Sequence, residues 1–176
     1  NAVWSIREIG GEMWFGTSKG LTILNKKTGL FTSVFHSDDD ASTLPSNNIL
    51  SILQTKKGEI WIGTTKGLCL LTSRKGGKFS FKNYPLNTTD LLNVQSVIED
   101  KNGNLWVGTK NKGLLKFDQK QKAFVSFLDP AKYSEINTDI RALVTDSHGS
   151  LWIGTYDGIY ILGLDKSLQK INNSNN

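Results

Sequence analysis

The sequence predicts an all-β protein made of four tandem units, each a sheet of four antiparallel strands. The first observation is a segment of the form W-x-G-T, with apolar residues on either side, that recurs at residues 13–24, 60–71, 105–117 and 151–162. The second is its period, because 47, 45 and 46 residues separate successive copies of its tryptophan: Trp14, Trp61, Trp106 and Trp152. The third is the alternation of short apolar runs with Gly-rich turns, which is typical of strands and hairpins.

Each unit begins with an apolar run that we expect to form a first strand, at residues 3–9, 49–55, 94–100 and 140–146. A Gly-rich turn follows three of these runs, around Gly58, Gly103 and Gly149. Asp100 and Asp146 each begin a D-x-x-G stretch, which places Asp at the first and Gly at the fourth position of a type I turn. We therefore expect these two aspartates to be structural rather than catalytic.

The second strand of each unit carries W-x-G-T, and a short hairpin leads from it to the third strand. The hairpin ends in glycine, which suits a backbone with positive φ, at Gly20, Gly67, Gly113 and Gly158. The third unit has one inserted residue, since three residues separate Thr109 from Gly113 where the other units have two. The fourth strands are expected at residues 31–35, 79–84, 123–128 and 167–171.

Repeated four-stranded units of this length predict the blades of a β-propeller. One such unit cannot bury both faces of its sheet, so it stacks on its neighbours, and radial stacking leaves only short, protected edges. The repeated tryptophan then fills the space between sheets, and the glycine two residues later allows close approach of backbone. We expect one propeller domain at 1–171, followed by a polar tail at 172–176, with blades at 3–35, 49–84, 94–128 and 140–171.

Charge and composition exclude several classes of function. The net charge of +5 comes from the second unit, because residues 49–93 hold seven basic and two acidic side chains while the other units are nearly balanced. The sequence contains no helix-turn-helix, zinc finger or recognition helix, so we expect no nucleic acid partner. Cys69 is the only cysteine, which excludes an internal disulfide. No apolar run approaches the length of a membrane-spanning helix, so we expect no membrane contact within this chain.

The motif W-[IFV]-G-T-x-x-G, preceded by an apolar strand and D-x-x-G-x-[LI], resembles the two-component regulator propeller repeat. The stretch DDDASTLPSNNILSI at 38–52 is similar to the linker between blades of that family, and the resemblance covers residues 3 to about 165. It implies a periplasmic or other extracytoplasmic sensor region of a hybrid two-component histidine kinase of the Bacteroides type. Such regions sense oligosaccharides released from glycans. The kinase and the membrane anchor would then lie outside this chain, which would itself be no enzyme.

Candidate ligand-binding residues lie where the loops of a propeller converge. On the usual strand order, the hairpins between second and third strands share one end of the blades with the interblade linkers. These hairpins offer Lys19, Lys66, Lys110, Asn111, Tyr156 and Asp157. The first strands add Trp4, Gln95 and Arg141 at equivalent positions. An indole that stacks on sugar faces, together with amide and guanidinium donors, suits an oligosaccharide ligand.

We predict no catalytic residues, no metal site and no cofactor. His36 and His148 are too isolated for metal-ligand spacing or for a nucleophile and base pair. The run Asp38, Asp39 and Asp40 lacks the alternating acids of a calcium-binding loop.

Two other functions and one assembly state stay open. The chain could be a propeller-fold polysaccharide lyase or glycosidase, although paired carboxyl groups facing each other are hard to find. It could also be a propeller that binds a protein partner, because fold does not determine function. Blades of this family usually form larger rings, so we expect a partial propeller with apolar faces around 3–9 and 159–164. Self-association or a homodimer would cover them.

Overall fold

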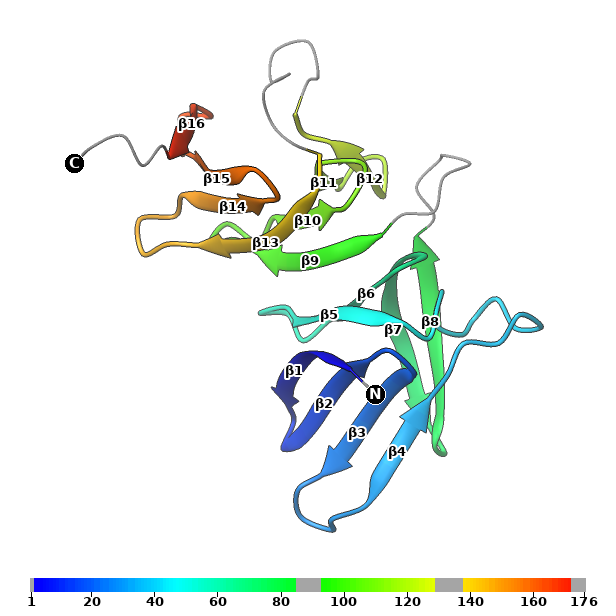
Figure 1. Cartoon of the computed structure of the whole chain (residues 1–176). Helices are drawn as coiled ribbons and strands as arrows, with labels where there is room; N and C mark the ends of the chain where they lie inside the picture. Colours follow the sequence, from blue (N-terminus) through cyan, green and yellow to red (C-terminus); the bar gives the residue numbers. More distant parts are fainter. Residues whose placement is uncertain (1, 85–92, 129–137, 172–176) are drawn as a thin grey trace. The chain divides into compact units, whose positions relative to one another are not determined.

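The computed structural model describes residues 2–84, 93–128 and 138–171, so the polar tail expected at 172–176 lies outside the described residues. In this part of the chain sixteen strands and no helix form, arranged as four sheets of four strands (Figure 1). This confirms the predicted all-β class and the four antiparallel propeller blades. The chain divides into two compact units, Asn1–Val94 and Gln95–Asn176.

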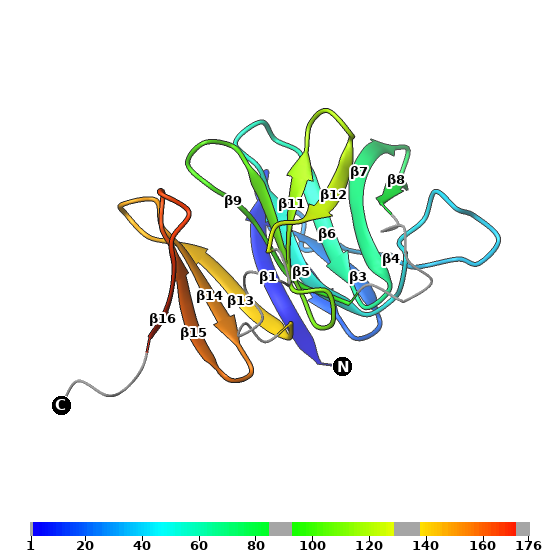
Figure 2. The same ribbon diagram turned by 90° about the horizontal axis from the view of Figure 1, so that it is seen from above.

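The first unit contains two blades. The strands of the first blade are β1 (Val3–Ile9), β2 (Glu12–Thr17), β3 (Gly20–Asn25) and β4 (Phe31–Val34). Those of the second are β5 (Ile49–Gln54), β6 (Ile60–Thr64), β7 (Gly67–Lys75) and β8 (Lys78–Tyr84). In each sheet the strands lie side by side in chain order, as Figure 1 shows, and Figure 2 shows the same order for β13 (Ile140–Thr145) to β16 (Leu168–Ile171).

The second unit repeats this pattern. The strands of the third blade are β9 (Val94–Glu99), β10 (Leu105–Thr109), β11 (Leu114–Asp118) and β12 (Ala123–Ser126). Those of the fourth are β13 (Ile140–Thr145), β14 (Leu151–Thr155), β15 (Gly158–Leu162) and β16 (Leu168–Ile171). Short strands separated by tight turns follow from the alternation of apolar runs with Gly, Asn and Asp.

The repeated glycine of W-x-G-T admits the first strand of the following blade. A Cβ atom built on Gly16 would lie 2.8 Å from Cγ2 of Ile49, and one on Gly108 would lie 2.6 Å from Cγ2 of Ile140. Carbon atoms in contact need about 3.5 Å or more. Only glycine therefore lets the β-branched residue that opens each first strand pack this closely, as expected from the sequence.

The last copy of the motif differs from the others. A Cβ atom on Gly154 would meet Ala142 of its own blade at an ordinary 3.5 Å. Trp152 is only partly buried, whereas Trp14, Trp61 and Trp106 are buried. The expectation that the repeated tryptophan fills space between sheets is therefore met less fully by Trp152 than by the other three copies.

Two hydrogen bonds join each described linker to the hairpins on either side of it. The N–H of Gly20 donates to the carbonyl of Asn47 at 2.6 Å, and the N–H of Thr65 in the next blade donates to that of Asn48 at 3.2 Å. In the second unit, Gly113 donates to Thr138 and Tyr156 to Asp139, both at 3.1 Å. The hairpin ends of neighbouring blades are thus held by adjacent carbonyls of one linker.

Candidate functional site

The four hairpins between second and third strands share one hydrogen-bond pattern, which the threonine of W-x-G-T creates. The hydroxyl of Thr17 donates to the carbonyl of Gly20 at 2.8 Å and accepts the N–H of Lys19 at 3.0 Å. Thr64, Thr109 and Thr155 make the same pair of bonds in the other blades. A buried hydroxyl that is paired this way fixes the loop, so the residue before each hairpin glycine is presented on a rigid turn.

This hydrogen-bond pattern shows which hairpin residues occupy the same position in the four blades. It corrects the predicted set in the third blade. Lys19, Lys66 and Asp157 are exposed at the position whose N–H bonds the threonine. In the third blade that position belongs to Lys112, which is partly buried and was not among the predicted residues. Lys110 and Asn111 are exposed in the same hairpin, but they precede the position whose N–H bonds the threonine. The inserted residue hid this alignment in the sequence.

The first-strand candidates Trp4 and Arg141 are β-bulge residues. The pairing of β1 with β2 passes from Val3 to Ser5, and that of β13 with β14 passes from Ile140 to Ala142, so one residue is left over in each strand. Leu50 is the extra residue of β5. A bulge re-aims the side chain it carries. Trp4 is 56% exposed, which is unusual for an indole, and Arg141 is also exposed.

In the second unit, several predicted residues come together at the hairpin end of the fourth blade. The guanidinium Nη2 of Arg141 lies 2.7 Å from Oδ2 of Asp139, and Tyr156, whose side chain is exposed, donates its N–H to the carbonyl of the same aspartate. Oδ1 of Asp157 lies 2.5 Å from Oγ1 of Thr155, and Oδ2 of Asp157 lies 3.8 Å from Nζ of Lys170. This end therefore presents donors, a phenol ring and carboxylates on fixed backbone.

The other candidates lie on other blades. Trp4, Lys19 and Lys66 belong to the first unit, at the same end of their blades. Gln95 is the second residue of β9 and is partly buried. The structure thus places the predicted residues at hairpins and first strands, and within the second unit it groups Arg141, Tyr156 and Asp157 at the hairpin end of the fourth blade.

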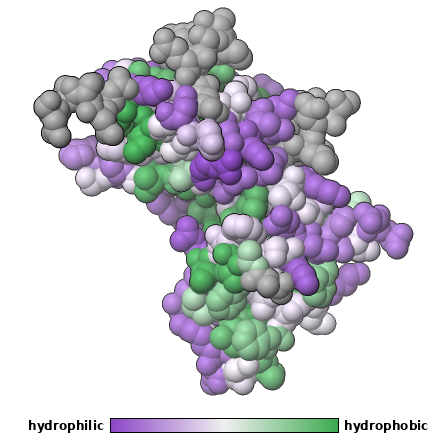
Figure 3. Space-filling model, in the orientation of Figure 1, coloured by the Kyte–Doolittle hydropathy of each residue, from purple (hydrophilic) through white to green (hydrophobic). Residues whose placement is uncertain are grey.

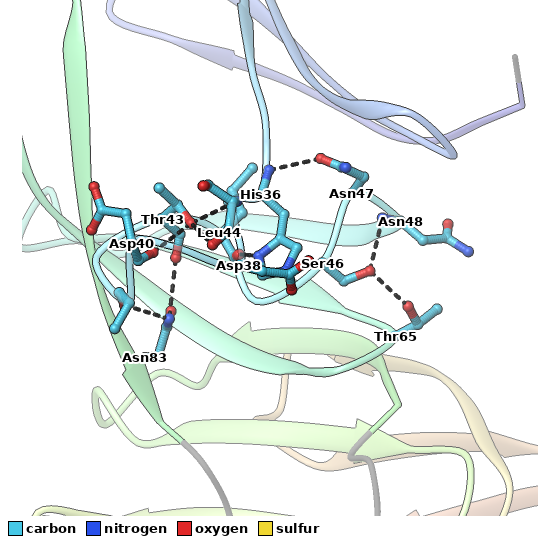
Figure 4. A network of polar contacts seen from close by, with 12 residues as sticks. His36, Asp38, Asp40, Thr43, Leu44, Ser46, Asn47, Asn48, Thr65 and Asn83 are labelled. Atoms are coloured by element: carbon cyan, nitrogen blue, oxygen red, sulfur yellow. Dashed lines mark hydrogen bonds and ion pairs between the residues drawn. The ribbon is translucent and has the colours of Figure 1, made fainter.

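The linker between the first two blades is a folded loop held by side-chain hydrogen bonds (Figure 4). The His36 ring contacts the Leu44 carbonyl through Nδ1 at 2.5 Å and the Asp38 carboxylate through Nε2 at 2.9 Å. Asp40 accepts both the N–H and the hydroxyl of Ser42, and this hydroxyl lowers the pKa of Asp40. Among the described residues, no group of three or more His, Cys, Asp or Glu side chains is placed to hold a metal ion.

Comparison with known proteins identifies the repeat. Three segments, residues 43–66, 90–111 and 134–157, match the two-component regulator propeller family. These three segments carry the two-component regulator propeller repeat. Each matched segment runs from a linker through a first strand to the W-x-G-T strand and its hairpin. No curated protein matches the chain.

The regulator propeller repeats of this chain superpose on solved extracellular sensor domains. One is a crystal structure described as the extracellular domain of a hybrid two-component system of B. thetaiotaomicron, which is 28% identical to this chain with a TM-score of 0.79. The match covers 100% of this chain and 23% of that domain. A second such domain from B. thetaiotaomicron has 21% identity and a TM-score of 0.79 over 96% of this chain and 23% of its own. The chain therefore spans about a quarter of the sensor domains it matches.

The same fold also occurs in an enzyme. The virginiamycin B lyase of Staphylococcus aureus has a TM-score of 0.70 and 15% identity over 98% of this chain and 56% of its own. At that identity the likeness shows the fold alone. Within the residues that the structure describes, no helix is long and apolar enough to cross a bilayer.

At the opposite end of the regulator propeller repeats, the turn aspartates bind the repeated tryptophans. Oδ2 of Asp100 accepts the indole N–H of Trp106 at 2.9 Å, and Oδ2 of Asp146 accepts that of Trp152 at 3.0 Å. Burial raises the pKa of Asp100, but the bonds from Trp106 and Asn104 outweigh it and the pKa is lowered. The pKa of Asp146 is lowered chiefly by the Trp152 N–H.

These bonds support the structural role expected for the D-x-x-G aspartates. The turn itself uses the other oxygen, since Oδ1 of Asp146 accepts the N–H groups of His148, Gly149 and Ser150. The sequence does contain a signal for the link to tryptophan, because Asp and Trp are six residues apart in both blades. A carboxylate held by this many donors is a poor base.

Proposed function

We propose that this chain is part of an extracytoplasmic sensor module that binds glycan-derived oligosaccharides and passes the signal to a histidine kinase outside these residues. The observation that carries the proposal is the regulator propeller repeat, together with 28% identity over the whole chain to an extracellular domain of a hybrid two-component system. The parent protein would be anchored in the membrane, with this part exposed outside the cytoplasm.

The proposed binding surface is the hairpin end of the blades. Trp4 offers an exposed indole on a bulge, which suits stacking on the apolar face of a sugar ring. Lys19 and Lys66 offer ammonium donors on turns that are fixed by threonine, and Arg141 and Tyr156 offer a guanidinium and a phenol on the fourth blade. In the second unit, Gln95, Lys110, Asn111 and Asp157 complete the proposed contacts of that unit's own hairpin end.

Calorimetric titration of the full sensor region with a panel of oligosaccharides tests this function. We expect one member to bind, and we expect Trp4→Ala to weaken that binding by about tenfold or more, since stacking on an aromatic side chain contributes on the order of 1–3 kcal/mol. Leu30→Ala, which removes an exposed apolar side chain at the other end of the first blade, is the matched control. Folded protein that binds no member of the panel would refute the proposal, and turnover of a polysaccharide would favour an enzyme.

We also propose that the isolated chain associates with a second copy of itself. In the first unit, β1 exposes half of Val3 and of Ile6, and Figure 3 shows apolar surface over the blade formed by β1–β4. In the second unit, Val144 is 61% and Ile159 is 46% exposed. Apolar residues this exposed on blade surfaces favour pairing. Sedimentation at micromolar concentration should show species larger than 19.5 kDa, and a stable monomer would exclude the pairing.

A further inference from the structure

The second unit contains a cavity at the turn end of its blades, opposite the hairpins. Its volume is about 310 Å³, and its walls come mainly from the turns and from the second and third strands of the third and fourth blades. The apolar part of the lining includes Phe127, Leu151, Leu162 and Leu164, together with Trp106. A volume near 300 Å³ lies at the lower limit for small-molecule sites, so it fits a ligand of one ring with its substituents.

Lys116 in this cavity departs from the repeat. In every blade one residue of the third strand pairs with the tryptophan of W-x-G-T. It is Ile23, Leu70 and Ile161 in the first, second and fourth blades, but Lys116 in the third. Its ammonium lies 5.0 Å from the centre of the Trp106 ring. Since an aliphatic side chain serves the fold at this position in three blades, packing alone does not require a lysine.

The lining carries a positive excess. Lys101, Lys116 and Lys166 contribute three positive charges and Asp100 one negative charge, which leaves an excess of two with His148 neutral. The carboxylate of Asp100 is already occupied, because it accepts the N–H groups of Asn102 and Asn104, the Asn104 amide and the Trp106 indole. Neutral donors therefore take up these hydrogen-bond sites, and the single charge of Asp100 offsets one of the three lysines.

A cavity at the same end of the first unit shows the contrasting case. It is lined by Trp14, Glu12 and Arg74 among others. There the guanidinium of Arg74 forms two bonds with the Glu12 carboxylate, at 2.5 and 2.9 Å, so the cation already has its anion from the neighbouring blade. In the second unit, no described acidic residue of the cavity lining forms such a two-bond ion pair with Lys116.

We propose that the cavity in the second unit binds a small organic carboxylate whose apolar ring rests against Phe127 and Leu164. The carboxylate accepts a hydrogen bond from the Lys116 ammonium, and Lys166 adds a second positive charge at the rim. Charge-assisted bonds of this kind are about twice as strong as neutral ones. A neutral ligand of the same shape would lack this bond. This site is independent of the oligosaccharide surface proposed above.

Two pairs of probes test the site on the 176-residue chain by amide NMR titration. Sodium D-glucuronate is compared with D-glucose, and sodium phenylacetate with phenylacetamide, so that each pair differs only in the carboxylate. We expect saturable shifts at the amides of Lys116 and Phe127 with at least one carboxylate, and none with its neutral partner. Binding of phenylacetate would support the apolar ring of the proposal, whereas binding of glucuronate alone would support the carboxylate contact and overturn the apolar ring.

The variant Lys116→Leu restores the residue type of the other blades, so it should fold and melt at or above the temperature of the wild type. We expect it to weaken binding of the carboxylate at least tenfold, Lys116→Arg to retain binding, and Lys120→Leu, which removes an exposed lysine outside the cavity, to leave it unchanged. The proposal fails if neither carboxylate saturates the shifts, if the neutral partners bind equally, or if Lys116→Leu binds as well as wild type.

Discussion

The substitution Gly108→Ala is expected to destabilise the fold, whereas Gly154→Ala at the same motif position is not. The Cβ that Gly108→Ala introduces would lie 2.6 Å from Cγ2 of Ile140, about 1 Å inside normal contact. Overpacking of a buried site costs about 1–3 kcal/mol, while replacing glycine removes about 0.4–1 kcal/mol of unfolded-state entropy. The free energy of unfolding should therefore fall, by up to about 2.6 kcal/mol.

Gly154→Ala keeps the favourable entropic effect and meets no close atom, because the nearest contact of its Cβ is Ala142 at 3.5 Å. We expect its free energy of unfolding to be unchanged or to rise by up to about 1 kcal/mol. Urea denaturation followed by tryptophan fluorescence measures both variants. A change of 1 kcal/mol moves the melting temperature of a chain this long by roughly 2–4 °C, so thermal melts provide a second readout.

The comparison would refute the role given to the repeated glycine in two ways. Gly108→Ala could be as stable as the wild type, which would mean that Ile140 is free to move away at no cost. Alternatively, Gly154→Ala could lose as much stability as Gly108→Ala, which would mean that the glycine serves its own strand rather than the neighbouring blade. Adding Ile140→Leu to Gly108→Ala, which removes the branched methyl group, should show a favourable coupling energy.

Three further predictions follow from single contacts. Arg74→Lys keeps the charge but loses the two-bond contact with Glu12. Because the Arg74 side chain is 39% exposed, we expect the free energy of unfolding measured by urea denaturation to fall by only about 1 kcal/mol. An unchanged free energy of unfolding would show that the pair is not structural. The folded-state pKa of Asp146 lies below its unfolded value near 3.9, so its stabilising effect is present above that pH and is lost as pH falls through the folded pKa. Melts from pH 7 to 2 should therefore show a smaller acid loss for Asp146→Asn than for the wild type, and an equal loss would contradict the Asp–Trp link. Cys69 is buried, and burial raises the pKa of its thiol. In the native protein it should therefore react with a thiol reagent only as fast as the fold opens, whereas in denaturant it should react fully. Fast labelling of the native protein would refute this.

Most of the strands could be predicted from the sequence because their signals are local. An apolar run, a turn glycine and the W-x-G-T motif are all read within a few neighbouring residues, and the four copies reinforce one another. The first strand expected at 3–9 is β1, and the fourth strand expected at 79–84 is β8 with one more residue. The turn role of Asp146 was also visible, since D-x-x-G is a local pattern.

Contacts between side chains from different strands were not visible in the same way. The insertion in the third blade concealed that Lys112 stands where Lys19 stands, because only the hydrogen bond from its N–H to Thr109 shows the alignment. The bulge that turns Trp4 outward depends on the pairing of two strands, so its exposure could only be suspected from its place outside the motif.

The sequence by itself determined the repeat, the order of the strands within each blade and the residues at the hairpins. Patterns of neighbouring residues and a fixed repeat length encode these features. Only the tertiary structure decided which charges are neutralised. Arg74 is 62 residues from Glu12 and yet bonds to it, while Lys116 lies over Trp106 in a cavity with a positive excess. The physical reason is that electrostatic and packing energies depend on distances of a few ångströms between atoms, which stacking of the blades sets and sequence separation does not.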